Sequence, residues 1–145
     1  MSAAGEVRAA VPLPVAGFTL LEALVVLAVL ALIAGIGFPR VDAAMRRFAA
    51  HEAAARVGRA LHAARAAAFR RDMPVRFMIL DEGRGFAVLD ERDRVPADLR
   101  AEASSGSILF FPDGTSAGGT VGLNGTGGRW RWHVHPTTGM IEDAR

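Results

Sequence analysis

The chain has 145 residues, which is enough for one small soluble domain beside a hydrophobic anchor. It contains no cysteine, and this excludes a disulfide, a thiol nucleophile and a cysteine-based metal site. The formal net charge is only +2, and the pI of about 10.8 is high because every basic Lys-or-Arg side chain is an arginine.

A hydrophobic segment near the N-terminus dominates the sequence. Residues 18–38 form an apolar run with one charged side chain, Glu22. The run is long enough to cross a hydrocarbon core of roughly 30 Å. An acidic residue costs about 3 kcal/mol at mid-helix and less near the end of the span, where Glu22 lies. We therefore expect a transmembrane helix over 18–38.

The residues before this run do not have the order of a secretory signal peptide. Such a signal places its small-residue cleavage site after the apolar stretch. Here the polar residues 1–17 come first, and the small residue Gly17 precedes the apolar stretch. Cleavage after Gly17 would remove a leader and keep the helix on the mature protein.

The junction Gly17-Phe18-Thr19-Leu20-Leu21-Glu22 resembles the processing site of type IV pilins and of type II secretion pseudopilins. The resemblance implies that a prepilin peptidase cuts between Gly17 and Phe18 and methylates the amine of Phe18. It also implies that Glu22, fifth from the new N-terminus, guides assembly, and that Pro39 is the proline often found at mature position 22. The implied partners are other pilins, and the implied location is the inner membrane with a periplasmic C-terminal domain. Many type IV pilins carry a C-terminal disulfide, and this chain departs from that pattern.

Charge chemistry agrees with this resemblance. Cleavage would leave a positive amine on Phe18, one helical turn from Glu22. The same carboxylate could instead meet the amine of the next subunit, which offsets the cost of a charge in lipid and sets the axial register. We predict that Glu22→Ala leaves membrane insertion intact and impairs assembly.

The helix is expected to continue beyond Pro39 as an amphipathic segment over 39–72. Apolar residues recur at spacings of three and four, which is the period of a helix. These residues are Val41, Met45, Phe48, Ala54, Val57, Leu61, Ala64 and Ala68. The helix should end before Pro74, because the residue that precedes a proline avoids the helical conformation. Glycines beside Pro39 lower helix propensity, so we expect a hinge over 31–39.

Residues 73–145 change from a helical pattern to short strands. We expect strands at 75–80, 86–89, 108–111, 129–135 and 140–142, a loop over 90–107, and tight turns at Asp113-Gly114 and Asn124-Gly125. The predicted fold class is α+β: a long N-terminal α-helix packed on a small, largely antiparallel β-sheet.

A second resemblance covers the C-terminal half. The stretch from Phe110 to Gly119, then Trp130 to Val134 and Thr138-Gly139, resembles the domain shared by minor pseudopilin H of type II secretion and the minor pilin FimT. Glycine and aspartate are natural in tight turns, so these residues also have a purely structural interpretation.

The segment 129–135 predicts one surface of interest. In a strand, Trp130, Trp132 and Val134 share one face, which we expect to be the core face. The other face carries Arg129, Arg131, His133 and His135. It is either a solvated strand face or a contact for an anion, a neighbouring subunit or DNA phosphate. Some FimT-like pilins bind DNA through a Gly-Arg-x-Arg tail.

The corresponding stretch here is Gly139-Met140-Ile141-Glu142, which disfavours nucleic acid. His133 and His135 lack a third ligand in sequence, so no metal is predicted. No cofactor and no catalytic constellation are evident, which predicts a protein that is not an enzyme.

Two function classes remain. The first is a minor pseudopilin at or near the tip of a periplasmic pseudopilus, which supports secretion and contacts secreted proteins. The second is a minor type IV pilin that acts in pilus assembly, DNA uptake or adhesion. The missing arginine tail favours the first.

Overall fold

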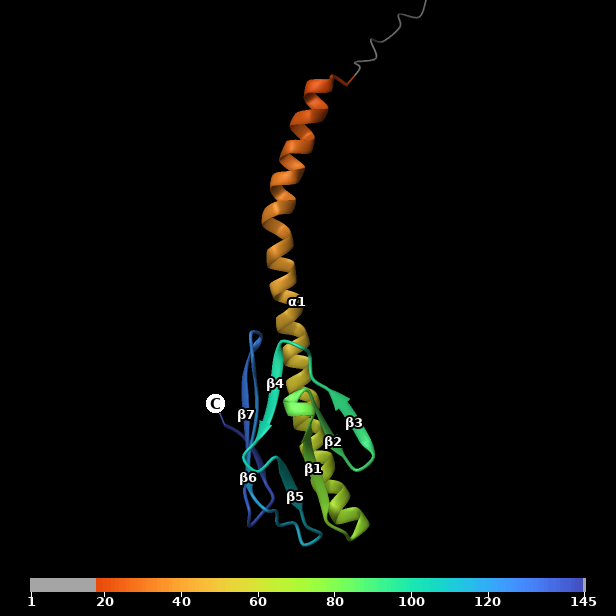
Figure 1. Cartoon of the computed structure of the whole chain (residues 1–145), viewed down its shortest axis with the longest axis vertical. Coiled ribbons are helices and arrows are strands. Elements are labelled where there is room, and N and C mark those ends of the chain that lie inside the picture. The colour runs from red at the N-terminus through yellow and green to blue at the C-terminus, as the bar shows by residue number, and fades with distance from the viewer. Residues whose placement is uncertain (1–17, 145) are drawn as a thin grey trace, which may run out of the picture. The chain divides into compact units, whose positions relative to one another are not determined.

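The computed structural model describes residues 18–144, without the side chains of residues 36–39. The chain divides into two compact units, Met1–Phe38 and Pro39–Arg145. Helix α1 (Leu20–Arg71) begins in the first unit and ends in the second, and all the strands belong to the second. The fold class predicted from sequence is confirmed, because a long N-terminal helix is followed by antiparallel sheets (Figure 1).

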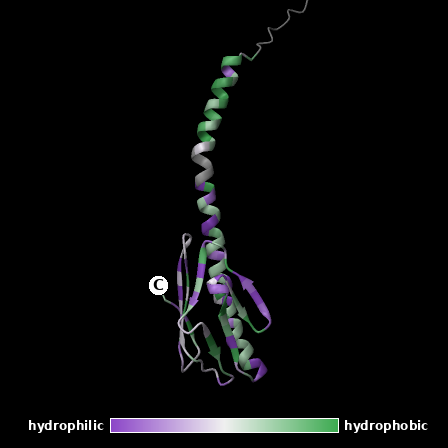
Figure 2. Ribbon diagram, viewed as in Figure 1, coloured by the Kyte–Doolittle hydropathy of each residue, from purple (hydrophilic) through white to green (hydrophobic). Residues whose placement is uncertain are grey.

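The first unit is the apolar start of α1. Its best 18-residue window has a mean hydropathy of 2.6, and none of that window is buried inside the structure. Large side chains such as Leu20, Leu27 and Leu32 are all more than half exposed. Figure 2 shows the hydrophobic colouring of most of this part of the helix, interrupted by a hydrophilic band near its start. By length and composition, this helix can cross a membrane, as the sequence predicts.

The second unit buries one face of α1. The predicted face residues Ala54, Val57, Leu61, Ala64 and Ala68 are all buried, at 5% exposure or less. The helix ends at Arg71, as expected from Pro74, and Asp72 takes a left-handed φ of 52°.

The first three apolar residues of the predicted helical series do not lie in this buried face. Val41, Met45 and Phe48 are at least 60% exposed, so the apolar series that begins at Val41 is not buried along its whole length. The buried face starts at Ala50, where Gly127 of the β-domain lies against the helix. The domain covers α1 only from this point, and helical spacing alone does not specify where cover begins.

Eight strands form two four-stranded antiparallel sheets. The first sheet has the order β3-β2-β1-β5 and the second β4-β6-β7-β8. The elements after α1 are β1 (Val75–Leu80), η1 (Asp81–Gly83), β2 (Gly85–Val88), β3 (Glu91–Arg94), β4 (Leu99–Ala103), β5 (Ser107–Phe110), β6 (Gly119–Gly125), β7 (Gly128–Val134) and β8 (Ile141–Asp143). Strands β1, β2, β5, β7 and β8 lie within one residue of their predicted bounds.

Three strands were not predicted. The expected loop over 90–107 contains β3 and β4, and the glycine-rich residues 119–125 form β6. Strand β3 is mostly charged and solvated, and β6 has too few large apolar side chains to show a strand pattern. Both are held by pairing with a neighbour, β3 with β2 and β6 with β4 and β7.

The Asn124-Gly125 pair is also not the predicted turn. Asn124 and Gly125 lie in β6, where they pair with Arg129 and Gly128, and the turn falls at residues 126–127. A Cβ at Gly125 would lie against the backbone carbonyl of Asp98, so glycine is needed here for a close backbone approach rather than for a turn.

One hydrophobic core joins α1 to both sheets. Its largest fully buried side chains come from all three layers and include Leu61 of α1, Phe77 and Phe110 of the first sheet, and Leu123 of the second. Phe77 stacks on Phe86 of the neighbouring strand, with 5.6 Å between the ring centroids. This core fixes which faces of the strands and of α1 remain available to partners.

Candidate assembly site and interaction surfaces

The predicted processing and assembly residues lie at the start of α1. Gly17 is outside the described residues, and Phe18 is 76% exposed just before the helix. Thr19 caps the helix, because its Oγ1 accepts a hydrogen bond of 3.2 Å from the backbone N–H of Glu22. Thr19 and Glu22 have the Thr-x-x-Glu spacing of a capping box, a signal in the sequence that our prediction did not use.

This geometry gives Glu22 two compatible roles. Its carboxylate lies in the first turn, where it complements the positive end of the helix dipole. It is also one turn from Phe18, which would carry the amine after cleavage. Both roles need the charge of Glu22, whereas the capping bond uses its backbone N–H and is kept when the side chain is changed.

Pro39 lies within the bounds of α1, at the boundary between the two units. A proline has no N–H to donate to the carbonyl four residues earlier, here that of Gly35. The expected hinge over 31–39 stays a prediction, and Pro39 is the residue that would weaken the helix there.

The tryptophans of β7 face the core, as expected. Trp132 is 6% exposed, Val134 is fully buried, and Trp130 packs partly buried against the core. The Trp130 ring meets the edge of the His51 ring, with 5.3 Å between centroids. This face of β7 thus packs the second sheet against α1.

The opposite face of β7 is less basic than the sequence indicates. Arg129 and Arg131 are exposed, and His133 and His135 are half-buried. Glu142 of β8 pairs with His133 in the strand register, and its Oε2 lies 3.2 Å from His135 Nε2.

A second carboxylate on this face comes from β4, which lies beyond β6 in the sheet. Asn124, the register partner of Arg129, donates a hydrogen bond of 2.7 Å to Glu102 Oε1. Glu102 and Glu142 therefore flank the arginines and histidines and offset part of the positive charge of this face, to which Arg100, the register partner of Asn124, also contributes.

His133 and His135 are close, with 4.7 Å between their ring centroids. Over residues 18–144, no group of three or more His, Asp or Glu side chains is arranged to hold a metal ion. The nearest acidic neighbour, Glu142, contacts His135 as an ion-pair partner when the imidazole is protonated.

The glycine-rich stretch after β5 has a structural role. The Asp113 carboxylate accepts hydrogen bonds from the hydroxyl (2.7 Å) and the backbone N–H (2.9 Å) of Thr115, and these bonds lower the pKa of Asp113. Ser116 donates through Oγ to the carbonyl of His135 and through its N–H to that of Pro136. Gly139 packs on the backbone of Gly114. The residues that carry the second resemblance therefore connect the turn at 113–116 to the segment after β7 by hydrogen bonds and close packing.

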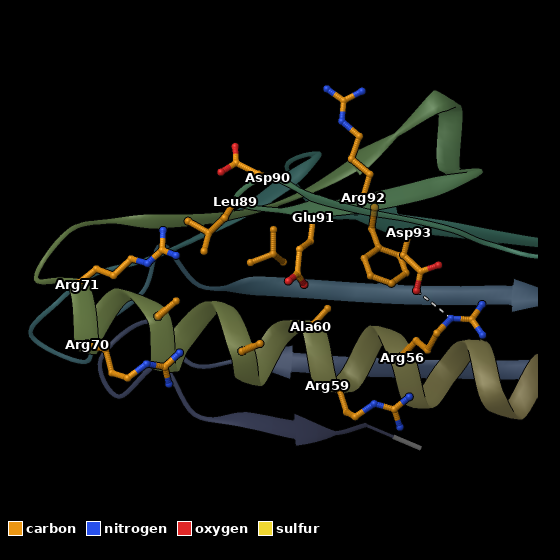
Figure 3. Close-up of a pocket in the computed structure, with 14 residues that line it drawn as sticks. Arg56, Arg59, Ala60, Arg70, Arg71, Leu89, Asp90, Glu91, Arg92 and Asp93 are labelled. Carbon is orange, nitrogen blue, oxygen red and sulfur yellow. Dashed lines mark hydrogen bonds and ion pairs between the residues drawn. The ribbon is translucent and has the colours of Figure 1, made fainter.

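A groove that sequence reasoning did not identify lies between α1 and the β2–β3 hairpin. Its volume is about 760 Å³. Arg56 closes one end, because its Nε lies 2.8 Å from Asp93 Oδ2 and its Nη2 donates to the carbonyl of Arg94 at 3.2 Å. Figure 3 shows Glu91 and Asp93 directed toward the helix and Arg92 directed away from it. The only signal in the sequence was the series of arginines on the helix.

Comparisons with known proteins agree with this architecture. Residues 14–38 match a protein family described as a prokaryotic N-terminal methylation motif. The fold is similar to that of the type IV minor pilin FimU of Pseudomonas aeruginosa strain PAO1 in two crystal forms, each 19% identical in sequence. The TM-scores are 0.52 and 0.54, over 67% and 74% of this chain and 90% and 93% of FimU. No curated protein matches the sequence. The chain is type IV pilin-like in its N-terminal motif and in its fold.

Proposed function

We propose that this protein is a minor subunit of a type IV pilin-like filament in the bacterial inner membrane and periplasm. Prepilin peptidase would cut between Gly17 and Phe18 and methylate Phe18. The helix over 18–38 would anchor the subunit and then pack in the filament, with the β-domain in the periplasm. The observation that supports this most directly is the methylation motif at 14–38 on a chain with the fold of a minor pilin. The proposed role needs no catalytic chemistry and no cofactor of its own.

Within this role, we favour a type II secretion pseudopilus. A subunit that binds DNA needs a positive face, since counterion release from phosphates supplies much of the affinity. The stretch Gly139-Met140-Ile141-Glu142 has no arginine and ends in an acid, and the Glu142 carboxylate lies beside His135. Glu102 adds a second acid to the same face. These contacts favour a protein partner, such as a neighbouring subunit or a secreted protein, over nucleic acid.

A minor type IV pilin is the second candidate. The similarity in fold to FimU, which is a type IV minor pilin, favours it, whereas the N-terminal motif fits both candidates. In that case the subunit would act in pilus assembly, DNA uptake or adhesion. The two candidates share processing and assembly, and they differ in what the finished filament handles.

The assembly step would depend on the charge of Glu22. A carboxylate in lipid is stabilised by a positive amine, either within its own helix or on the next subunit. The intermolecular pair forms at one axial stagger only, so it would fix how far each subunit is shifted along the filament.

The test compares secreted proteins in four strains: one lacking the chain, and three complemented with wild type, Glu22→Ala or Glu22→Gln. Glutamine keeps the length and hydrogen-bonding capacity of the side chain and removes only its charge. If charge pairing drives assembly, both variants insert into the membrane, and neither restores secretion.

Restoration by Glu22→Gln would contradict the charge argument. An unchanged secretion profile in the strain lacking the chain would reject the pseudopilus. Pilus counts and uptake of labelled DNA would then decide whether the filament is a type IV pilus.

A further inference from the structure

Strand β3 is an edge strand with free backbone groups. It pairs with β2, and the sheet order places no strand on its other side. The N–H of Val95 donates to the carbonyl of Arg84 at 2.8 Å. In an antiparallel ladder the bonded pairs alternate, so the backbone groups of Arg92 and Arg94 point to the free edge. The carbonyl of Arg94 is taken by Arg56, which leaves Arg92 to offer both its N–H and its carbonyl.

The groove beside this edge carries apolar side chains on its helix and sheet sides, although Glu91 and Asp93 are also directed into it. Its helix side carries Ala60, Ala63 and Ala67, whose small side chains leave room above the helix. Its sheet side carries Phe86 and Val88. An extended segment laid along β3 would therefore direct every second side chain onto an alanine surface.

Arginines outnumber acidic residues along the lining of this groove. Five arginines and three acids line the groove, and Arg56 and Asp93 pair with each other. Among the described residues, the other arginines have no carboxylate within ion-pair distance; these are Arg59, Arg70, Arg71 and Arg92. Only two unpaired acids, Asp90 and Glu91, oppose them.

The dimensions suit a short strand. Arg59 and Arg70 are eleven residues apart on α1, which is about 16 Å along a helix axis. About five extended residues cover that distance. Leu89 stands near one end of the groove, 39% exposed and with a φ of +54°, an unfavourable conformation for leucine. It offers an apolar contact for the end of such a segment.

We propose that this groove binds an extended acidic segment of a partner protein, which joins β3 as an additional strand. Apolar side chains of the segment lie on Ala60, Ala63 and Ala67. Its acidic side chains alternate with them and face outward, beside Arg92. Backbone pairing gives affinity, and the alternation of acid and apolar residues gives specificity. The proposal does not depend on which filament contains the subunit.

The binding test uses the full chain in detergent micelles and three labelled heptapeptides. The first alternates aspartate and valine, the second alternates lysine and valine, and the third is the aspartate peptide with N-methylated central amides. Fluorescence anisotropy should show binding of the first, with at least tenfold weaker binding of the other two. Arg92→Glu should weaken binding of the aspartate peptide at least tenfold and improve binding of the lysine peptide. Arg129→Glu, on the other sheet, is the matched control and should change neither.

Equal affinity for the lysine peptide would overturn the charge argument, and equal affinity for the N-methylated peptide would overturn strand addition. Failure of Arg92→Glu to weaken binding would place the peptide elsewhere.

A cysteine experiment tests the location, because the chain has no cysteine of its own. With diamide added as the two-electron oxidant, Ala63→Cys should form a disulfide with an aspartate peptide that carries one cysteine at an inward-facing position. Ala55→Cys is exposed on another face of α1 and should react at least tenfold more slowly. Equal rates would reject the groove as the site. If Ala63→Cys instead links two copies of the chain and the peptide does not compete, the occupant is a second copy, and the proposed acidic partner is wrong.

Discussion

Truncation of Leu61 tests the face of α1 that holds the β-domain. Leu61 is fully buried in the core, and Phe69 is 74% exposed two turns later on the same helix. Leu61→Ala should strongly destabilise the domain, whereas Phe69→Ala, which removes a larger side chain, should have little effect. The pair separates burial from the size of the truncation.

The expected magnitude follows from burial. Leucine-to-alanine changes in protein cores cost about 2–5 kcal/mol, and the cost rises with the cavity that remains. Leu61 lies in a cluster that includes both sheets, so the surroundings have little freedom to collapse, and we expect about 3 kcal/mol. For a domain of this size, that lowers the melting temperature by roughly 12–18 °C. Phe69→Ala should change stability by no more than about 0.5 kcal/mol.

Tryptophan fluorescence provides the assay. The chain has two tryptophans, Trp130 and Trp132, and both lie on β7 in the second unit. Thermal unfolding of the full chain in detergent therefore reports on the β-domain and not on the apolar start of α1. Equal destabilisation by the two variants would show that α1 presents a different face to the sheets.

Two further predictions concern the turn that follows β5. Gly139→Ala should cost at least about 1 kcal/mol more than Gly106→Ala in the same unfolding assay, because both glycines have positive φ but only a Cβ at Gly139 would meet a backbone atom, the carbonyl oxygen of Gly114; equal costs would contradict the close packing. Thr115→Val should raise the pKa of Asp113 toward its ordinary value, as measured by carboxyl NMR titration, because the Thr115 hydroxyl is the main cause of the lowered pKa and the Thr115 N–H the next. A folded-state pKa below the unfolded one gives stability that is present at neutral pH and is lost as the pH falls through the folded pKa, so the variant should lose less stability in acid than wild type; an unchanged pKa would refute this.

The N-terminal quarter of the chain was predictable because its signals are local. The Gly17-Phe18 junction, the apolar length of 18–38 and the position of Glu22 depend on covalent order alone. The match of residues 14–38 to a methylation motif supports the resemblance to type IV pilins, and the cleavage at Gly17-Phe18 and the role of Glu22 stay predictions. The buried face of α1 from Ala54 to Ala68 was also predictable, since a helix repeats every 3.6 residues whatever it packs against.

The pairing of the strands and the part of α1 that the β-domain covers were not predictable in the same way. The exposure of Val41, Met45 and Phe48 depends on where the β-domain begins to cover the helix, and their spacing carries no such information. Strands β3 and β6 exist because neighbours complete their hydrogen bonds, so neither needs an alternating apolar pattern of its own.

The surfaces that could meet partners were decided by tertiary structure. The arginines of β7 looked like an isolated basic face until pairing brought Glu142 and Glu102 onto the same side of the sheet. In the sequence, the arginines of α1 indicate only a solvated helix face. In the structure, several of them line a groove whose other side is the β2–β3 hairpin. Sequence by itself determined which side chains the protein carries and the period at which they repeat. Strand register and sheet position decided which charges face each other, because those distances are set between segments far apart in the chain.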